Sequence, residues 1–172
     1  MASKGSKRTR MSAGERREQL IEVSRGLFAT KGFDGTSIEE IASRAKVSKP
    51  VVYEHFGGKE GLYAVIVDRE LTTISTTITR ELGSSSSASI TVARTALALL
   101  TYIEDSPDGF RILSSGNDRA SGTYSTLLAD VAIQVSGLLA AQFSDHGIDP
   151  RLAPLYAQML VGIVAMPSQW WL

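Results

Sequence analysis

Apolar residues recur at intervals of three and four positions along most of the chain, a spacing that places side chains on one face of an α-helix. No stretch alternates between apolar and polar residues, as a half-buried strand would. The pattern therefore predicts an all-α protein. The expected helices cover residues 13–31, 38–45, 50–56, 59–82, 90–104, 110–113, 123–144 and 150–172, with loops at 83–89 and 114–122.

The short helix that ends at residue 56 carries its own start and stop signals. Ser48 is a favourable N-cap, and Pro50 in the first turn loses no hydrogen bond, because the first N–H groups of a helix have no partner. Gly57 and Gly58 follow, and glycine tolerates the left-handed backbone that ends many helices. These signals predict a helix of about two turns, which needs support from the rest of the fold.

The faces of this short helix differ in character. Val52 and Phe56 lie four residues apart and share the face that can anchor the helix to a core. The other faces carry a cation, a phenol and a small apolar group, from Lys49, Tyr53 and Val51. A mixture of this kind suits the groove of a DNA duplex.

Another short helix is predicted directly before it. Thr36 with Glu39, and Ser37 with Glu40, form two overlapping capping-box patterns at its start. Only residues 46–49 connect the two helices. So tight a turn between two short helices is typical of a helix-turn-helix motif.

Charge is divided unevenly along the neutral chain. Residues 1–60 hold twelve Lys and Arg against eight Asp and Glu, for a net charge of +4, whereas residues 61–172 hold six against ten, for −4. A basic third joined to an acidic remainder indicates a module that binds a polyanion, attached to a domain with another role. Residues 1–12 are polar and aperiodic, which indicates a disordered arm. It is either a solvated tail or an arm that reaches DNA through Lys7, Arg8 and Arg10.

Metal, cofactor and enzyme functions find no support in the residues. The chain has no cysteine, and its two histidines, His55 and His146, are far apart in sequence. We therefore expect no metal site, no cofactor and no enzyme activity. The basic N-terminus lacks the apolar run of a secretory signal, so a cytoplasmic protein is expected.

The uncharged segment 152–172 is long enough to span a bilayer. Pro154, Pro167 and several polar residues interrupt it, and no basic flank follows, so we expect no membrane span. A helix that is apolar all round in a soluble protein is buried on every side. We expect the helix at 123–144 to cover one side of this segment and a second copy of the chain to cover the other.

The segments Thr36–Ala42, Val47–Phe56 and Gly57–Leu62 together resemble the signature of the TetR family of bacterial transcriptional repressors in order, spacing and caps. The resemblance implies a helix-turn-helix DNA-binding domain at residues 13–58 and a helical effector-binding and dimerisation domain at residues 59–172. It further implies a homodimer that reads a palindromic double-stranded operator and releases the operator when a small effector binds.

The resemblance also implies which residues contact DNA. Thr36 and Ser37 match the phosphate-contacting start of the second helix, and Lys59 matches the start of the fourth. Arg44 lies on the outer side of the second helix, and the other matches lie on the third. The full predicted set is Thr36, Ser37, Arg44, Ser48, Lys49, Pro50, Val51, Tyr53, His55 and Lys59. Glu54 departs from the pattern, because a carboxylate beside DNA repels phosphate unless it accepts from a cytosine amino group.

An effector pocket is expected between the helices of the second domain, lined by apolar side chains with few polar groups. The candidates are Tyr102, Phe110, Tyr124, Leu128, Gln158, Met159, Met166 and Trp170. Each of them, taken singly, is better explained as an ordinary core residue. Such a lining favours a largely apolar effector, such as a lipid or an aromatic molecule.

Two further alternatives stay open at this stage. The chain ends inside what resembles the eighth helix, whereas the dimers of the family pair helices eight and nine; either the chain is truncated, which we expect, or its dimerisation surface differs. The chain could also be a protein-interaction or adaptor module with a degenerate helix-turn-helix.

Overall fold

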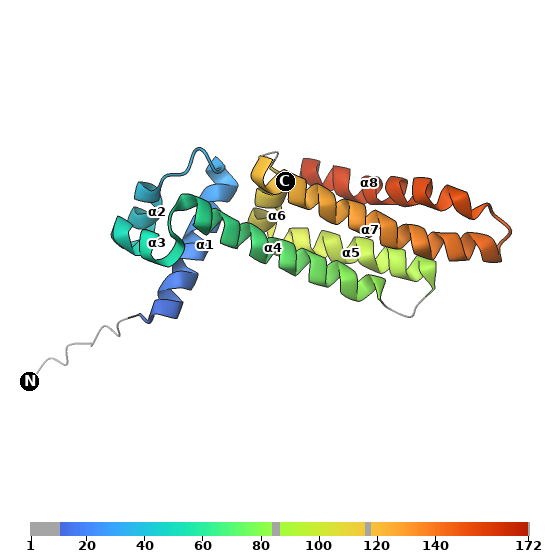
Figure 1. Cartoon of the computed structure of the whole chain (residues 1–172), viewed down its shortest axis with the longest axis horizontal. Coiled ribbons are helices and arrows are strands. Elements are labelled where there is room, and N and C mark those ends of the chain that lie inside the picture. Colours follow the sequence, from blue (N-terminus) through green and yellow to red (C-terminus); the bar gives the residue numbers. More distant parts are fainter. Residues whose placement is uncertain (1–10, 84–86, 116–117, 172) are drawn as a thin grey trace, which may run out of the picture.

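The computed structural model describes residues 11–83, 87–115 and 118–171, and every regular element within these ranges is a helix (Figure 1). In chain order the elements are α1 (Ala13–Lys31), α2 (Ile38–Ala45), α3 (Lys49–Phe56), α4 (Lys59–Leu82), α5 (Ala88–Asp105), α6 (Pro107–Ser114), α7 (Asp118–Asp145), the 3-10 helix η1 (Pro150–Leu152) and α8 (Ala153–Trp171). The all-α fold class predicted from the sequence is confirmed.

The chain forms a small head and a longer helical bundle (Figure 1). The head consists of α1, α2 and α3, and α4 begins in the head and continues along the bundle beside α5, α7 and α8. The short helix α6 lies at the end of the bundle nearest the head, where it packs on α1 and α4. The arrangement is the predicted N-terminal helix-turn-helix unit followed by a helical domain. Residues 1–10 of the expected arm lie outside the described residues.

Local signals set the ends of the helices in the head. The Ser37 hydroxyl accepts a hydrogen bond from the backbone N–H of Glu40 at 3.2 Å, as a cap of α2 should. Gly57 ends α3 in a left-handed conformation with φ of 72°. Ser48 occupies the N-cap position of α3 as predicted, but its side chain makes no capping hydrogen bond. The turn between α2 and α3 instead places Lys46 in the left-handed region, with φ of 56°.

The loop predicted at residues 114–122 is largely wrong. The helix α6 runs to Ser114, and α7 already begins at Asp118. Small and polar residues in this stretch weaken intrinsic helix propensity. Extending a helix that a long apolar stripe has already formed requires no new nucleus, so helix replaces most of the expected loop.

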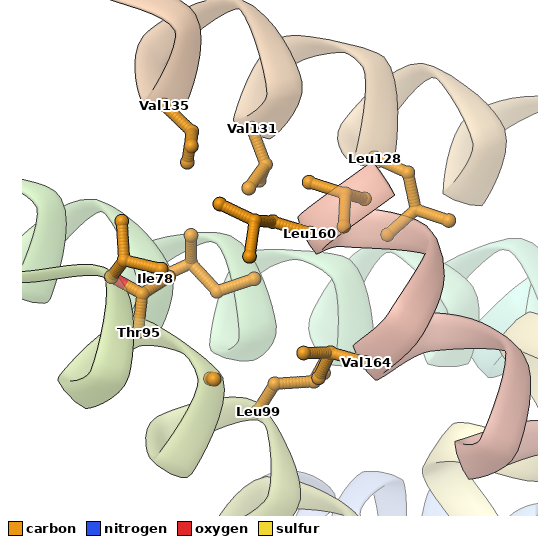
Figure 2. Close-up of a pocket in the computed structure, with 11 residues that line it drawn as sticks. Ile78, Thr95, Leu99, Leu128, Val131, Val135, Leu160 and Val164 are labelled. Carbon is orange, nitrogen blue, oxygen red and sulfur yellow. The ribbon is translucent and has the colours of Figure 1, made fainter. Parts of the chain in front are cut away.

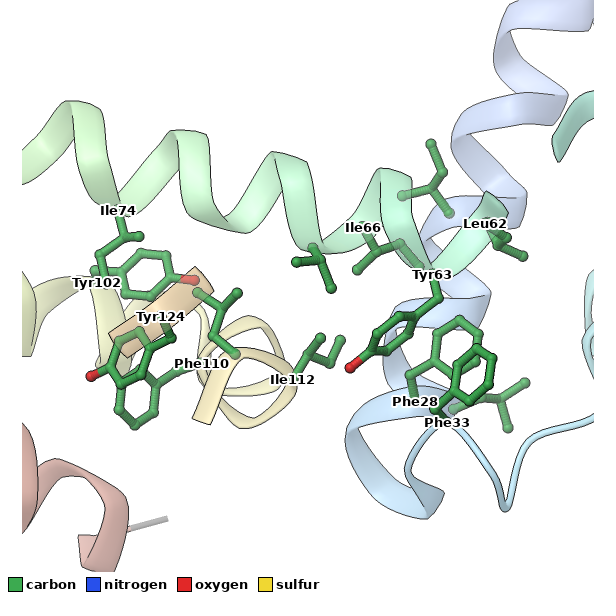
Figure 3. Packing of buried hydrophobic residues seen from close by; sticks show 14 of the residues in the cluster. Phe28, Phe33, Leu62, Tyr63, Ile66, Ile74, Tyr102, Phe110, Ile112 and Tyr124 are labelled. Atoms are coloured by element: carbon green, nitrogen blue, oxygen red, sulfur yellow. The ribbon is translucent and has the colours of Figure 1, made fainter. Parts of the chain in front are cut away.

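One hydrophobic core runs from the head into the bundle (Figure 3). In the head, the rings of Phe28, Phe33 and Tyr63 pack with centres 5.0 to 6.1 Å apart. At the near end of the bundle, Phe110 and Tyr124 pack edge to face with ring centres 5.8 Å apart. All five side chains are buried. The head and the bundle are therefore joined by continuous apolar packing rather than by a free linker.

Within this chain the last helix is buried on one side only, and coverage of its other side by a second copy of the chain stays a prediction. Small side chains face the bundle from α8, among them Ala157 and Ala165. Large apolar side chains on its other side are each more than half exposed; they are Leu155, Met159, Ile163, Met166 and Trp170. We call these five residues the outer face of α8. The predicted packing of α8 on α7 is confirmed.

Within the described part of the chain, one helical segment, residues 124–145 of α7, is long and apolar enough to cross a membrane. Core helices of water-soluble proteins meet the same criteria of length and composition. The helix α7 packs against α8 and also against α4, α5 and α6. One side of the segment is buried in the bundle through Tyr124, Val131 and Val135.

Candidate nucleic-acid interface and effector cavity

The helix α3 is held by its inner face and presents its outer face to solvent. Val52 is fully buried in the core of the head. The guanidinium of Arg17 on α1 lies over the ring of Phe56, 5.0 Å from its centre, and fastens the last turn of α3. The exposed side chains of this helix and its N-cap are Ser48, Lys49, Pro50, Tyr53 and Glu54. These residues form a continuous surface of the size that enters a DNA groove.

Nine of the ten residues predicted to contact DNA lie at least partly at the surface of the head. Six of them are exposed: Ser37, Arg44, Ser48, Lys49, Pro50 and Tyr53. Three are half-buried: Val51, His55 and Lys59. The fold therefore brings residues from the second, third and fourth helices to one end of the molecule. Their contact with DNA stays a prediction.

Thr36 is the exception, and its assignment as a side-chain contact to DNA is corrected here. The residue is 2% exposed, and its hydroxyl donates to the carbonyl oxygen of Gly32 at 2.8 Å. Its backbone N–H bonds to the carbonyl oxygen of Phe33. Neither group is free for a phosphate, so Thr36 closes the turn between α1 and α2.

Lys59 has a structural role that the sequence pattern did not show. Its ammonium donates to the carbonyl oxygens of Phe33 at 2.9 Å and Thr36 at 3.0 Å. It also lies 4.2 Å from the centre of the Phe33 ring. Lys59 thereby ties the start of α4 to the turn before α2, which places α4 rigidly on the head.

The cation at the start of α3 is already paired with an acid. The Lys49 ammonium lies 2.6 Å from a carboxylate oxygen of Glu39, in the first turn of α2. This hydrogen bond raises the pKa of Lys49 and lowers the pKa of Glu39. Both side chains are exposed, so the pair is open to exchange with a phosphate oxygen.

A hollow between α1 and α3 adds a residue that the sequence did not single out. Arg16 lines this hollow together with Ser48 and His55. The guanidinium is half-buried and donates to Gln19 at 2.5 Å. Arg16 lies in the first turns of α1 and belongs to no sequence motif. Only the folding of the head brings it beside α3.

An aliphatic cavity of about 50 Å³, partly open to solvent, lies among the helices of the bundle (Figure 2). Four helices supply its lining, which consists of Ile78, Val92, Thr95, Ala96, Leu99, Leu128, Val131, Val135, Leu160, Val161 and Val164. The one hydroxyl in this set, on Thr95, donates within its own helix to the carbonyl oxygen of Thr91 at 2.8 Å. The cavity therefore offers an aliphatic surface without aromatic rings or charges.

Of the eight residues predicted to bind an effector, only Leu128 lines this cavity. Phe110 and Tyr124 pack on each other in the core. The four predicted residues on α8 are exposed on its surface: Gln158, Met159, Met166 and Trp170. Of these, Trp170 lines a separate surface groove. Along α8, residues that line the cavity alternate at helical spacing with residues of the outer face. Because the helix carries no charge, its sequence does not show which face is buried and which is exposed.

Tyr102 belongs to a polar cluster at the junction of head and bundle. Its hydroxyl donates to Glu70 at 2.7 Å, and the hydroxyl of Ser106 donates to the same carboxylate oxygen at 3.1 Å. The other oxygen of Glu70 lies 2.7 Å from Nε of Arg25 on α1, and Arg25 also donates to Ser106. Burial and the bond to Glu70 raise the pKa of Tyr102. We call these four residues the Glu70 cluster; it joins α1, α4 and α5.

The packing around the Glu70 cluster leaves no room for a larger residue at Gly109. A Cβ atom on Gly109 would lie 2.0 Å from a carboxylate oxygen of Glu70. The absence of a side chain is what lets α6 approach the cluster. The helix α6 therefore packs directly against the carboxylate of Glu70.

Within the described ranges, no group of three or more acidic or histidine side chains is placed to hold a metal ion. The predictions of no metal, no cofactor and no enzyme activity remain predictions.

The head is similar in sequence to known bacterial helix-turn-helix regulators. Residues 20–66 match the family model described as bacterial regulatory proteins, tetR family. YerO, an uncharacterized HTH-type transcriptional regulator of Bacillus subtilis, is 50% identical over 48 residues, which are 28% of this chain and 17% of YerO.

The similarity extends beyond the head in other relatives. The HTH-type transcriptional activator FasR of Mycolicibacterium smegmatis is 28% identical over 167 residues, which are 95% of this chain and 75% of FasR. The structure of the ketosteroid transcriptional regulator KstR2 of Mycobacterium tuberculosis covers 90% of this chain and 82% of its own at 17% identity, with a TM-score of 0.74. The transcriptional regulator PfmR of Thermus thermophilus covers 90% and 85% at 20% identity, with a TM-score of 0.70. At these identities the solved structures show a shared fold.

Proposed function

The chain belongs to the TetR family of bacterial regulatory proteins, and we propose that it is a dimeric repressor that leaves a palindromic operator when a small apolar effector binds. As a DNA-binding transcriptional regulator it uses a helix-turn-helix head. We assign residues 13–58 to DNA binding and residues 59–172 to effector binding and dimerisation. The relative FasR is named an activator, so the sign of regulation is part of the proposal.

The observation that carries the proposal is the two-sided character of α3. Val52 anchors the helix while Lys49, Pro50 and Tyr53 project from it into solvent. In a helix-turn-helix protein the N-terminal residues of the second helix contact base edges in the major groove. We assign groove contacts to Pro50, Val51, Tyr53 and His55, and we assign Lys49, at the start of α3, to a phosphate at the edge of the groove. Phosphate contacts are assigned to Ser37, Arg44, Ser48 and Lys59, with Arg16 added from its place beside α3.

The outer face of α8 supports a dimer. A row of five large apolar side chains on one helix is a surface that water-soluble proteins rarely leave uncovered. A second copy of the chain would cover it through a two-fold interface, in which the same surface is used by both partners. A two-fold dimer matches a palindromic operator, with its recognition helices about 34–36 Å apart on the DNA.

The cavity in the bundle supports an effector that is largely aliphatic. Its lining has neither aromatic rings nor charges, so we favour a lipid-like molecule over an aromatic one. The helix α4 lines the cavity through Ile78 and also starts in the head, where Lys59 holds it. Expansion of the cavity would therefore move α4 and change the spacing of the two heads.

A duplex selected by the protein from a random pool provides the ligand for the test. We expect Lys49→Ala and Tyr53→Ala to weaken binding of this duplex by about tenfold or more, since a lost contact of this kind costs about 1–3 kcal/mol. Lys49→Ala should also lower the slope of log affinity against log salt by about one. Arg151→Ala, at an exposed cation of η1 far from the head, is the matched control.

Wild-type affinity in both variants would overturn the assignment of α3. If no duplex is selected at all, the adaptor hypothesis replaces the regulator. The sign of regulation is tested by a reporter placed behind the selected duplex, which a repressor silences and an activator induces.

A further inference from the structure

The hydroxyl of Tyr124 is buried without a hydrogen-bond partner among the described residues. The side chain is 3% exposed, and burial raises its pKa to about 12. A buried polar group without a partner is costly, and most such groups in proteins are satisfied by a neighbour, a water or a ligand. The hydroxyl of Tyr124 can therefore donate a hydrogen bond to a ligand that supplies an acceptor.

Helical spacing places this donor at one end of the aliphatic cavity. Leu128, Val131 and Val135 line the cavity from α7. Tyr124 precedes Leu128 by four residues and so lies on the same face of α7, one turn nearer the head. Figure 3 shows it there beside Phe110, in the layer of the bundle next to α6.

The facing helix brings a second polar group to the same end. Val164 lines the cavity from α8, and Ser168 follows it by four residues on the same face. Ser168 is 1% exposed, and its hydroxyl donates to the carbonyl oxygen of Val164 at 2.7 Å. Because α7 and α8 run in opposite directions (Figure 1), Tyr124 and Ser168 both lie just beyond the head-side end of the cavity.

A surface groove between α5 and α8 adjoins this end. It has a volume of about 380 Å³ and is lined by Leu100, Ile163, Val164, Pro167, Ser168 and Trp170. The groove shares Val164 with the cavity and contains Ser168. The cavity and the groove therefore adjoin at Val164, and we infer that a ligand reaches solvent through the groove.

Among the side chains that the structure describes, no charged one lines the cavity or the groove. Burying a carboxylate or an ammonium without a partner of opposite charge is strongly unfavourable. A single neutral acceptor, by contrast, would satisfy the hydroxyl of Tyr124.

We propose that the effector is an uncharged amphipathic molecule with an aliphatic chain and one carbonyl group, and that this carbonyl accepts a hydrogen bond from Tyr124. The chain occupies the cavity, the carbonyl lies at its head-side end, and the rest of the molecule leaves through the groove between α5 and α8. The inference rests on the proposed function, because it names the ligand class of the same site.

Two small probes of equal chain length distinguish the contribution of the aliphatic part of the ligand from that of its carbonyl. They are 2-hexanone, which has an acceptor, and 1-hexene, which has none. Binding is measured by calorimetry on the full chain, for wild type and Tyr124→Phe. We expect the variant to bind 2-hexanone about three- to tenfold more weakly than wild type, as for the loss of one hydrogen bond. Binding of 1-hexene should be the same in both proteins.

Equal affinity of wild type and variant for 2-hexanone would overturn the role of Tyr124 and leave the cavity as an effector site. Binding of neither probe to wild type would overturn the ligand class altogether. Val131→Trp, which fills the cavity, should abolish binding of both probes; retained binding in that variant would place the probes elsewhere. DNA binding is measured separately on the selected duplex, so a failure here is distinct from a failure of the regulator assignment.

Discussion

The ammonium of Lys49 and a carboxylate oxygen of Glu39 lie 2.6 Å apart on the face of the head that we assign to DNA. One residue begins the recognition helix and the other lies in the first turn of the helix before it. The pair holds the lysine side chain in one position and cancels its charge at short range. We therefore expect DNA binding to exchange the carboxylate for a phosphate at this lysine.

Removal of the carboxylate of Glu39 should make the head less selective for DNA sequence. We expect Glu39→Gln to increase affinity for a duplex of unrelated sequence, because the freed cation of Lys49 gains a phosphate contact and a repulsive charge is lost. Fluorescence anisotropy across a series of salt concentrations measures the effect. Glu18→Gln is the control, since Glu18 forms an exposed pair with Arg69 on α4. An unchanged affinity in Glu39→Gln would show that Lys49 does not approach phosphate.

A charge on the outer face of α8 should separate the dimer. We expect Ile163→Glu to sediment as a monomer, because a carboxylate cannot be buried in an apolar interface without a partner. Its affinity for the selected duplex should fall with the loss of the second head. Leu97→Glu places the same charge at an equally exposed leucine on α5 and should leave the dimer intact. A dimeric Ile163→Glu protein would move the interface to another surface.

The Glu70 cluster should contribute strongly to stability because it is shielded from water. The side chain of Glu70 is 12% exposed and that of Arg25 is 21% exposed. We expect Glu70→Gln to lower the free energy of unfolding by about 2–3 kcal/mol, since the variant leaves the shielded guanidinium of Arg25 with only the exposed carboxylate of Glu22, 3.8 Å away, as a counter-charge. Urea unfolding followed by circular dichroism provides the measurement.

The matched control for this cluster is again the pair between Glu18 and Arg69. It joins the same two helices, α1 and α4, but its side chains are 58% and 43% exposed. Exposed pairs contribute about 0–1 kcal/mol. Similar losses in Glu18→Gln and Glu70→Gln would contradict the special role of the buried cluster.

Tyr124 should produce a loss of stability at high pH. An unfolded tyrosine releases its proton near pH 10, whereas burial holds the pKa of Tyr124 at about 12. Between these values the unfolded state binds fewer protons than the folded state, so stability falls as pH rises, by about 1.4 kcal/mol per unit. Below pH 10 this contribution is constant.

The variant Tyr124→Phe lacks this proton and should lose less stability than wild type between pH 10 and pH 12. Urea unfolding at pH 9, 10 and 11 measures the difference, which should be constant up to pH 10 and change only above it. A constant difference across the whole range would show that Tyr124 ionises in the folded protein as it does in the unfolded chain.

Much of the head was predictable from the sequence, because its signals are local. The boundaries of α1, α2 and α4 follow from caps, glycines and apolar spacing, each of which acts within four residues. The buried position of Val52 and the exposed positions of Lys49 and Tyr53 follow from the helical period alone. The resemblance of residues 36–62 to a known signature added the function.

The effector site was not predictable in the same way. Of the residues expected to bind an effector, Leu128 lines the aliphatic cavity, and its contact with an effector stays a prediction. The apolar stripe of α7 does not reveal which of its neighbours leave a space. Met159 and Met166 lie on the outer face of α8 and do not line the aliphatic cavity, because an uncharged helix carries no charge to mark its exposed side. Tyr102 also lies outside this cavity, and Glu70, 32 positions earlier, accepts a hydrogen bond from its hydroxyl.

The sequence by itself determined the helices, the helix-turn-helix motif and the face of α3 that is exposed, because these depend on backbone propensity and spacing within one or two turns. The tertiary structure alone decided the pairing of Lys49 with Glu39, the burial of Thr36, the Glu70 cluster and the donor left free on Tyr124. Each of these depends on distances between side chains from different helices. Such distances are set only when the apolar faces pack together, and no local pattern encodes them.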